Sequence, residues 1–207
     1  MIEELINKKA QCIVENIAQE SIDVYRFIAT QFEKSDVSKD YIFQFVFRSF
    51  YRMDSAGLSK EFKDRYFELF QSVRGSKNLD MGEILNELYK FKSLNGLNTI
   101  QFSFVTKLAN TIENTYPIYD SEVARMYGYR TPYTYKDKEE RVSEYLAAYS
   151  ELRIRYQAYI RTNSLSEAIS VFDRELISAE DIPTTKKIDF LIWSAGKLKR
   201  AGKLIHA

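Results

Sequence analysis

Apolar side chains recur at helical spacing along most of the chain. Over residues 2–33 they lie four or seven positions apart, which places them on one stripe of a helix with about 3.6 residues per turn. The residues of this stripe are Ile2, Ile6, Ile13, Ile17, Val24 and Ile28. The pattern predicts a single long amphipathic helix over residues 2–33.

The same spacing, together with capping residues and breaks, predicts the other helices. We expect them at about 39–53, 59–73, 80–92, 99–114, 120–127, 137–161 and 164–176, with a last helical stretch after Pro183. Ser59, Asp80, Asp120 with Ser121, and Ser164 are the predicted N-terminal residues. Helix 39–53 is rich in aromatic residues on all sides, which predicts that it is largely buried.

Turn-forming residues are scarce in this chain. It has 7 glycines and 3 prolines among 207 residues, whereas a β-sandwich or barrel needs a turn every 8–12 residues or so. We therefore predict an all-α protein of nine or ten helices, folded as one domain over residues 1–207. Two lobes, 1–95 and 96–207, are the alternative to one undivided unit.

Histidine and cysteine are nearly absent. His206 and Cys12 are the single residues of their types, so only His206 could serve a Ser-His-Asp or Cys-His mechanism. One residue of each type is too few for a cysteine and histidine zinc site. A lone cysteine allows no intrachain disulfide, and nothing indicates an oxidising compartment. We expect no cofactor.

The start of the chain and its apolar runs argue against export and membrane insertion. The opening segment Met1-Ile2-Glu3-Glu4 is acidic where a signal peptide is basic. The longest apolar runs, such as residues 190–193, are only a few residues long, and a transmembrane helix needs about 20. We expect a cytoplasmic protein without membrane contact.

The net charge is close to zero, but its distribution is uneven. The formal charge is +1, from 30 basic and 29 acidic residues. Residues 183–207 hold six basic residues against Asp189 alone: Lys186, Lys187, Lys197, Lys199, Arg200 and Lys203. Such a basic segment either contacts phosphate or an anionic surface, or is a solvated helix end whose cations suit the helix dipole.

Tyrosines form a stripe on the predicted helix 137–161. The stripe has a spacing of three and four residues, and four arginines flank it: Tyr145, Tyr149, Leu152, Tyr156 and Tyr159, with Arg141, Arg153, Arg155 and Arg161. Aromatic side chains interleaved with arginine can stack on single-stranded nucleic acid. The alternative is a core face whose hydroxyl groups reach the surface.

One segment resembles a known family. Residues 94–109 form a predicted turn followed by a helix, and they lead into Tyr116-Pro117-Ile118-Tyr119-Asp120-Ser121-Glu122-Val123. This arrangement resembles the helix-hairpin-helix DNA glycosylase superfamily, in which a helix, a short hairpin and a second helix are followed by a Pro/Ala-Val-Asp segment that opens a further helix. The resemblance covers about 35 of the 207 residues.

The resemblance implies a fold, a partner and a reaction. Double-stranded DNA would be held at its phosphates by the hairpin, and a flipped base would enter a pocket between two helical lobes. Asp120 would be the catalytic carboxylate, and Lys107 is the candidate for the family's lysine nucleophile. The implied nucleic-acid-binding residues are Asn98, Thr99, Gln101, Ser103, Arg125 and Arg130.

The chain departs from the family pattern at two places. Lys107 precedes Asp120 by 13 positions, whereas the family lysine lies about 18–19 positions before the aspartate, so that Ser103 or a neighbour falls nearer its place. The position of the family's glycine pair, which allows close approach to phosphate, reads Asn98-Thr99-Ile100-Gln101. The cysteines of an iron–sulfur cluster are also absent.

Asp120 and Lys107 can each also be explained by a purely structural role. Asp120 has the position of a helix N-cap, and Lys107 that of a surface helix lysine. The alternative function is therefore non-enzymatic. The chain would then be a helical protein that binds a partner or itself through the apolar faces of helix 2–33 or 137–161, or a degenerate glycosylase fold without catalysis. A cleft that is lined by Asp120 and Lys107 and ringed by Arg125, Arg130 or Lys136 would favour the enzyme.

Overall fold

The computed structural model describes residues 1–76 and 78–204, and it is all-helical, as predicted. Lys77 and His206 lie outside the described residues. The described part holds eleven α-helices and one 3-10 turn: α1 (Ile2–Lys8), α2 (Ala10–Glu15), α3 (Gln19–Lys34), α4 (Tyr41–Phe50), η1 (Met53–Ser55), α5 (Lys60–Ser72), α6 (Met81–Tyr89), α7 (Phe102–Ile112), α8 (Ser121–Tyr127), α9 (Lys138–Thr162), α10 (Ser166–Glu175) and α11 (Thr184–Arg200).

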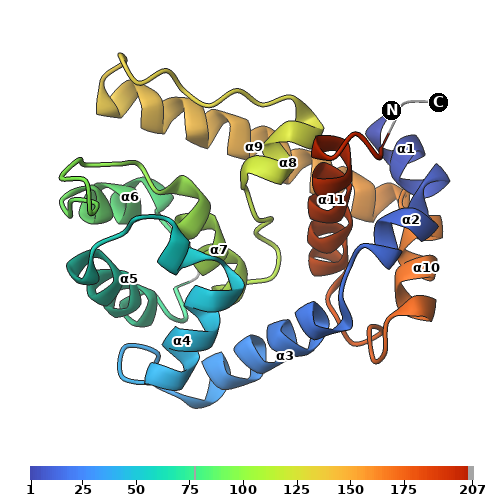
Figure 1. Cartoon of the computed structure of the whole chain (residues 1–207), viewed down its shortest axis with the longest axis horizontal. Coiled ribbons are helices and arrows are strands. Elements are labelled where there is room, and N and C mark those ends of the chain that lie inside the picture. The colour runs from blue at the N-terminus through green and yellow to red at the C-terminus, as the bar shows by residue number, and fades with distance from the viewer. Residues whose placement is uncertain (77, 205–207) are drawn as a thin grey trace.

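The helices gather into two groups (Figure 1). Helices α4 to α7 lie on one side of the molecule, and α1, α2, α10 and α11 lie on the other. Helices α3 and α9 run between the two groups. Helix α11 contacts α2 directly, because Ser194 Oγ donates to the Ile13 carbonyl at 2.7 Å and accepts from Asn16 Nδ2 at 2.9 Å.

Side-chain caps fix where five of the eleven α-helices in the described part of the chain begin. Each capping side chain accepts a hydrogen bond from a backbone N–H of the first turn, and this satisfies a donor that would otherwise have no partner. The helices capped in this way are α4, α5, α6, α8 and α9, by Asp40, Ser59, Asp80, Asp120 and Asp137. The predicted cap at Ser164 is wrong, because α10 begins after Leu165 and has no side-chain cap.

The prediction of one helix over residues 2–33 is wrong. The backbone leaves helical geometry at Lys9 and again at residues 16–18, so that three helices replace one. The stripe that supported the prediction is still largely buried, including Ile6, Ile13 and Ile28. The apolar period therefore reports correctly which face is covered, but it does not reveal the bends between the helices.

Helix α4 is less buried than its composition predicted. Phe43 and Phe47 are fully buried and pack against the aromatic rings of α5. Tyr41, Ile42 and Phe45, however, are 80%, 68% and 62% exposed. Only one face of α4 is covered by the other helices, and the expectation of burial on every side is wrong.

The tyrosine stripe of α9 belongs to the core. Tyr149, Leu152, Tyr156 and Tyr159 are buried, and Tyr145 stacks on Phe102 of α7 with ring centres 5.0 Å apart. These tyrosines are therefore covered by the protein itself and offer no stacking surface to a nucleic acid.

Helix α11 carries buried charges at its start. Lys186, Lys187 and Asp189 are 2%, 6% and 4% exposed. Lys187 pairs with Asp173 at 2.6 Å, while Lys186 and Asp189 face the interior between the two helix groups. The basic segment is therefore a solvated helix end only in its later part.

None of the described helices combines the length and apolar character that crossing a bilayer requires.

Candidate functional site

A cavity of about 510 Å³ lies between the two helix groups. This volume falls in the range of about 300–1,000 Å³ that is typical of small-molecule sites. Its walls come from α3, from the end of α4, from α7, from the start of α8 with the segment before it, and from α11. The polar residues of the wall are Ser21, Arg52, Ser103, Lys107, Asp120, Ser121, Glu122, Lys186, Asp189, Lys197 and Arg200.

The two predicted catalytic residues line this same cavity. Asp120 comes from the segment between α7 and α8, and Lys107 comes from α7 itself. Ser103, which was predicted to bind nucleic acid, is a third lining residue. The cavity thus brings together residues that the sequence places up to 17 positions apart.

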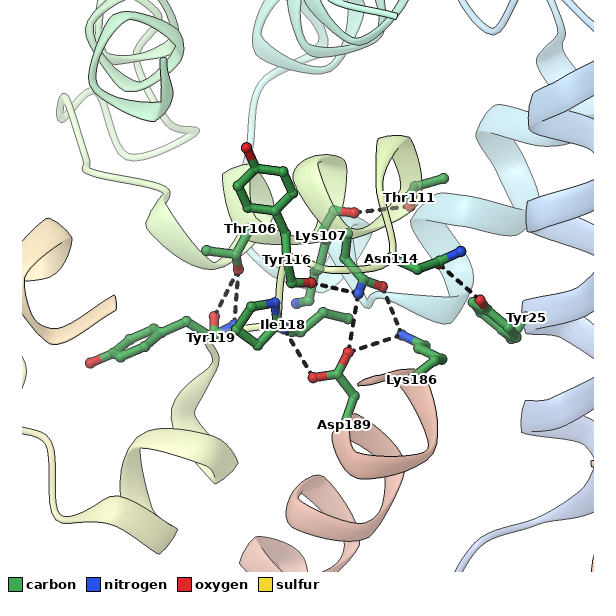
Figure 2. Close-up of polar contacts among 12 residues, drawn as sticks. Tyr25, Thr106, Lys107, Thr111, Asn114, Tyr116, Ile118, Tyr119, Lys186 and Asp189 are labelled. Carbon is green, nitrogen blue, oxygen red and sulfur yellow. Dashed lines mark hydrogen bonds and ion pairs between the residues drawn. The ribbon is translucent and has the colours of Figure 1, made fainter. Parts of the chain in front are cut away.

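Buried polar side chains hold the segment 116–119 in place (Figure 2). Thr106 Oγ1 accepts from the Tyr119 N–H at 3.0 Å and donates to the Tyr119 carbonyl at 3.2 Å. Asp189 Oδ1 accepts from the Ile118 N–H at 3.0 Å. Asn110 Nδ2 donates to the Tyr116 carbonyl at 2.7 Å, and the Tyr149 hydroxyl donates to the Pro117 carbonyl at 2.8 Å. Together these bonds anchor all four residues of the segment 116–119. The backbone that carries Asp120 is therefore fixed on several sides.

Asp120 combines a capping role with a place at the cavity. Its Oδ1 atom accepts hydrogen bonds from the N–H groups of Glu122 at 2.9 Å and Val123 at 3.0 Å. Both bonds go to the same oxygen of the carboxylate, and the side chain stays partly exposed. The predicted cap is confirmed, and it does not prevent the carboxylate from lining the cavity.

Lys107 is a buried amine and not a surface lysine. It is 8% exposed, and its Nζ atom donates to Ser103 Oγ at 3.0 Å. The amine also lies 4.8 Å from the ring centre of Phe104 and 5.4 Å from that of Tyr51. Burial lowers the pKa of Lys107 most, the charge of Asp120 partly offsets this and the charge of Lys186 adds to it, so that the pKa is about 8.

A second lysine lies deeper in the same cavity wall. Lys186 Nζ donates to Asn110 Oδ1 at 3.1 Å and lies 3.8 Å from Asp189 Oδ2. Burial lowers the pKa of Lys186, and the charge of Asp189 opposes this shift. Burial likewise raises the pKa of Asp189, while Lys186 and the Ile118 N–H act in the other direction. The two residues form a buried ion pair that also holds the segment before Asp120.

Further basic side chains surround the cavity. Lys197 lies over the Trp193 ring at 4.3 Å from its centre, and Arg200 pairs with Glu122 at 3.1 Å. Arg52 is exposed and has a left-handed backbone with φ of 55°, which is uncommon for a residue with a side chain. Of the charged residues in the wall, five are basic and three are acidic, so the site favours an anionic ligand.

Some predicted nucleic-acid-binding residues lie elsewhere. Asn98 Nδ2 donates to the Tyr89 carbonyl at 2.6 Å, and Gln101 Nε2 donates to Thr99 Oγ1 at 2.7 Å, so these three side chains contact the loop between α6 and α7. Arg125 pairs with Glu122 at 2.7 Å, and Arg130 is exposed. A ring of Arg125, Arg130 or Lys136 around the cleft would have favoured the enzyme, but none of the three is among the lining residues of the cavity.

Several functional candidates were not found from the sequence. Lys186 and Asp189 were counted as charges of a basic tail, and Thr106, Asn110 and Gly196 were not singled out. The available signal was the spacing of Lys186 and Asp189 in a helix that also carries Ile188, Leu191 and Ile192. Charged residues interspersed with such an apolar stripe can lie on the covered face of the helix.

Comparison of the chain with protein-family models, with curated proteins and with solved structures gave no match.

Proposed function

We propose that this protein is a DNA N-glycosylase of the helix-hairpin-helix type, with Asp120 as its catalytic carboxylate. The observation that carries the proposal is that Asp120 and Lys107 line one cavity of about 510 Å³ between two groups of helices. Such a cavity has room for a base that is flipped out of the duplex. The surrounding Arg52, Lys197 and Arg200 supply positive charge for the phosphates beside that nucleotide.

The proposed reaction breaks the bond between the base and the deoxyribose. Positive charge develops on the sugar as the base leaves with the bonding electrons, and the Asp120 carboxylate stabilises this charge. A nucleophile then attacks the C1′ atom. With water the product is an abasic site, and a proton of the water neutralises the departing base. With the Lys107 amine the product is an imine: one amine proton neutralises the departing base, and the other goes to the ring oxygen as the C1′–O4′ bond breaks.

The position of Lys107 supports the second route. The 13 positions between Lys107 and Asp120 differ from the family spacing. The lysine nevertheless lines the same cavity as the carboxylate, and its lowered pKa favours the unprotonated amine that a nucleophile requires.

The alternative, a non-enzymatic binding protein, was expected to use the apolar faces of residues 2–33 or 137–161. Both faces are packed inside the chain: Ile6, Ile13, Tyr149 and Tyr156 are each at most 3% exposed. The polar cavity therefore supports the enzyme more directly than these faces support a docking protein.

Base release from duplex DNA tests the proposal. The wild-type protein is incubated with a panel of duplexes, each carrying one damaged or mismatched base, and strand cleavage after alkali reports the release. Asp120→Asn keeps the capping geometry, because asparagine caps helices as well as aspartate, and we expect it to lower release by about 10²-fold or more. Asp137→Asn is the matched control, since Asp137 caps α9 at the surface and leaves the cavity unchanged.

Trapping with borohydride tests the role of Lys107 separately. Reduction of an imine links the protein covalently to the DNA, and the linked peptide identifies the lysine. Release without trapping would assign the reaction to Asp120 and water. If the protein neither releases any base of the panel nor binds a duplex with an abasic-site analogue, the glycosylase proposal is wrong.

A further inference from the structure

Lys186 is a buried charge for which the proposed reaction has no use. It lines the same cavity as Lys107, is 2% exposed and comes from α11, whereas Lys107 comes from α7. The two ammonium groups approach the same aromatic ring, since Lys107 Nζ lies 5.4 Å and Lys186 Nζ 5.9 Å from the ring centre of Tyr51. Figure 2 shows both side chains at the segment that leads to Asp120.

The two lysines differ in how well their charge is compensated. Lys186 has a carboxylate partner in Asp189 at 3.8 Å, an acceptor in Asn110 Oδ1 at 3.1 Å, and the rings of Tyr25 and Phe190 at 5.0 and 5.3 Å. Lys107 has a neutral acceptor, Ser103 Oγ, and the rings of Phe104 and Tyr51. A buried ammonium with a carboxylate partner keeps its proton more readily than one without.

We infer that Lys186 is an activating residue for Lys107: its ammonium, held by Asp189 and Asn110, disfavours a second positive charge nearby and keeps the Lys107 amine free to react. This inference rests on the proposed function insofar as the free amine serves a nucleophilic reaction. Lys186 itself does not contact the reacting atoms in this scheme, so it acts through Lys107.

The charged and titratable groups around Lys107 come from every element that packs against it. Asp120, before α8, favours the protonated amine, whereas Lys186 of α11 opposes it. Tyr51, after α4, is neutral, because burial raises the pKa of its hydroxyl far above the usual value. Asp189 of α11 is paired with Lys186. Lys186 is thus the positive group that counteracts Asp120.

Chemical labelling of lysines without DNA tests the inference. Brief treatment with acetic anhydride at a series of pH values modifies only unprotonated amines, and mass spectrometry of the Lys107 peptide gives the pH at which half of this amine is free. In the wild-type protein we expect this midpoint near pH 8. Lys186→Met should raise it by about one unit or more, which lowers the labelling of Lys107 near pH 7.5 by about tenfold.

Two further variants exclude other causes. Lys186→Arg keeps the charge and should keep the low midpoint. The double variant Lys186→Met with Asp189→Asn removes both charges of the ion pair, and its midpoint should also be raised. A double variant with the wild-type midpoint would show that the shift in Lys186→Met comes from the unpaired Asp189, and this would overturn the inference, as would an unchanged midpoint in Lys186→Met.

The wild-type protein gives a second reading that does not depend on whether a variant folds. The same experiment labels Lys186, and the inference requires that Lys107 becomes free at a lower pH than Lys186. The reverse order would overturn it. Because the labelling involves no DNA, a protein that releases no base can still show the coupled pair, so failure of the proposed function and failure of this inference are separate results.

Discussion

Gly196 in α11 lies directly against the backbone of Glu122 in α8. A Cβ atom at position 196 would lie 2.4 Å from the Glu122 carbonyl oxygen and 2.8 Å from its carbonyl carbon, well inside van der Waals contact. Only glycine therefore allows the two helices to approach so closely. Because Asp120 caps α8 and Lys186 belongs to α11, this contact sets the distance between two walls of the cavity.

Gly196→Ala should therefore destabilise the protein. The added methyl group forces α8 and α11 apart, and overpacking of this kind costs about 1–3 kcal/mol. Urea unfolding would measure the loss, and base release should fall with it. Gly82→Ala in α6 is the control, because its new Cβ would meet its nearest atoms at 3.2 and 3.8 Å. Equal stability of Gly196→Ala and the wild type would contradict the close contact.

Thr106 anchors the segment before Asp120, and its hydroxyl group should be essential for that role. Thr106→Val keeps the shape but leaves the buried N–H group of Tyr119 without its acceptor, and it removes the hydroxyl proton that the carbonyl groups of Tyr119 and Ser103 share. Such an unsatisfied group costs about 1–3 kcal/mol, so both the unfolding free energy and base release should fall. Thr106→Ser retains the hydroxyl group and should restore most of both. If Thr106→Val and Thr106→Ser have the same unfolding free energy and the same base release, the hydroxyl group does not anchor the segment.

Lys107 should reduce stability at neutral pH. Burial lowers the pKa of its amine from 10.5 to about 8, so between these two values the unfolded chain binds more protons and stability rises with pH. Below pH 8 the full penalty applies, and Lys107→Met should add about 2–3 kcal/mol to the unfolding free energy at pH 7.

The gain in unfolding free energy from Lys107→Met should become smaller as the pH approaches 10. Urea unfolding at pH 7 and pH 10 measures the difference. Lys39→Met, at a lysine whose side chain is 83% exposed, controls for the loss of one positive charge. A methionine variant that is less stable than the wild type at pH 7 would show that Lys107 stabilises the fold through its contacts.

The basic residues around the cavity should make DNA binding sensitive to salt. Each of Lys197→Gln and Arg200→Gln should weaken duplex binding several-fold and reduce the slope of log affinity against log salt by about one. Arg174→Gln is the control, since Arg174 lies on α10, pairs with Glu175 and does not line the cavity. Fluorescence anisotropy at several salt concentrations measures both quantities. Equal slopes in all three variants would place the DNA elsewhere.

The sequence predicted the features that depend on local chemistry. The caps at Ser59, Asp80 and Asp120 are confirmed because a side-chain oxygen bonds its own helix within three residues. The tyrosine face of α9 is confirmed as core. The bends at Lys9 and at residues 16–18 were missed, since both sides of each bend keep the apolar period and no proline or glycine marks it.

The parts of the site that depend on distant residues were not predictable. Asp189 binds the Ile118 N–H across 71 positions, and Lys186 binds Asn110 across 76. From the sequence alone, a charged residue is assigned to the surface, because the partner that would compensate its burial is not known. Gly196 had no signal of its own, because its role appears only when α8 lies against it. The candidate carboxylate could be named from the sequence, and the residues that hold it could not.

The contact of Ser194 with Ile13 and Asn16 joins two segments that are translated far apart in time. The Ser194 hydroxyl and the Ile13 carbonyl are 181 positions apart. At a translation rate of about 5–20 residues per second, the first two helices wait roughly 10–40 s for the helix that covers them. During this interval the apolar side chains of these two helices, including Ile6 and Ile13, lack the cover that α11 provides, and the same helix later completes both that cover and the wall of the cavity.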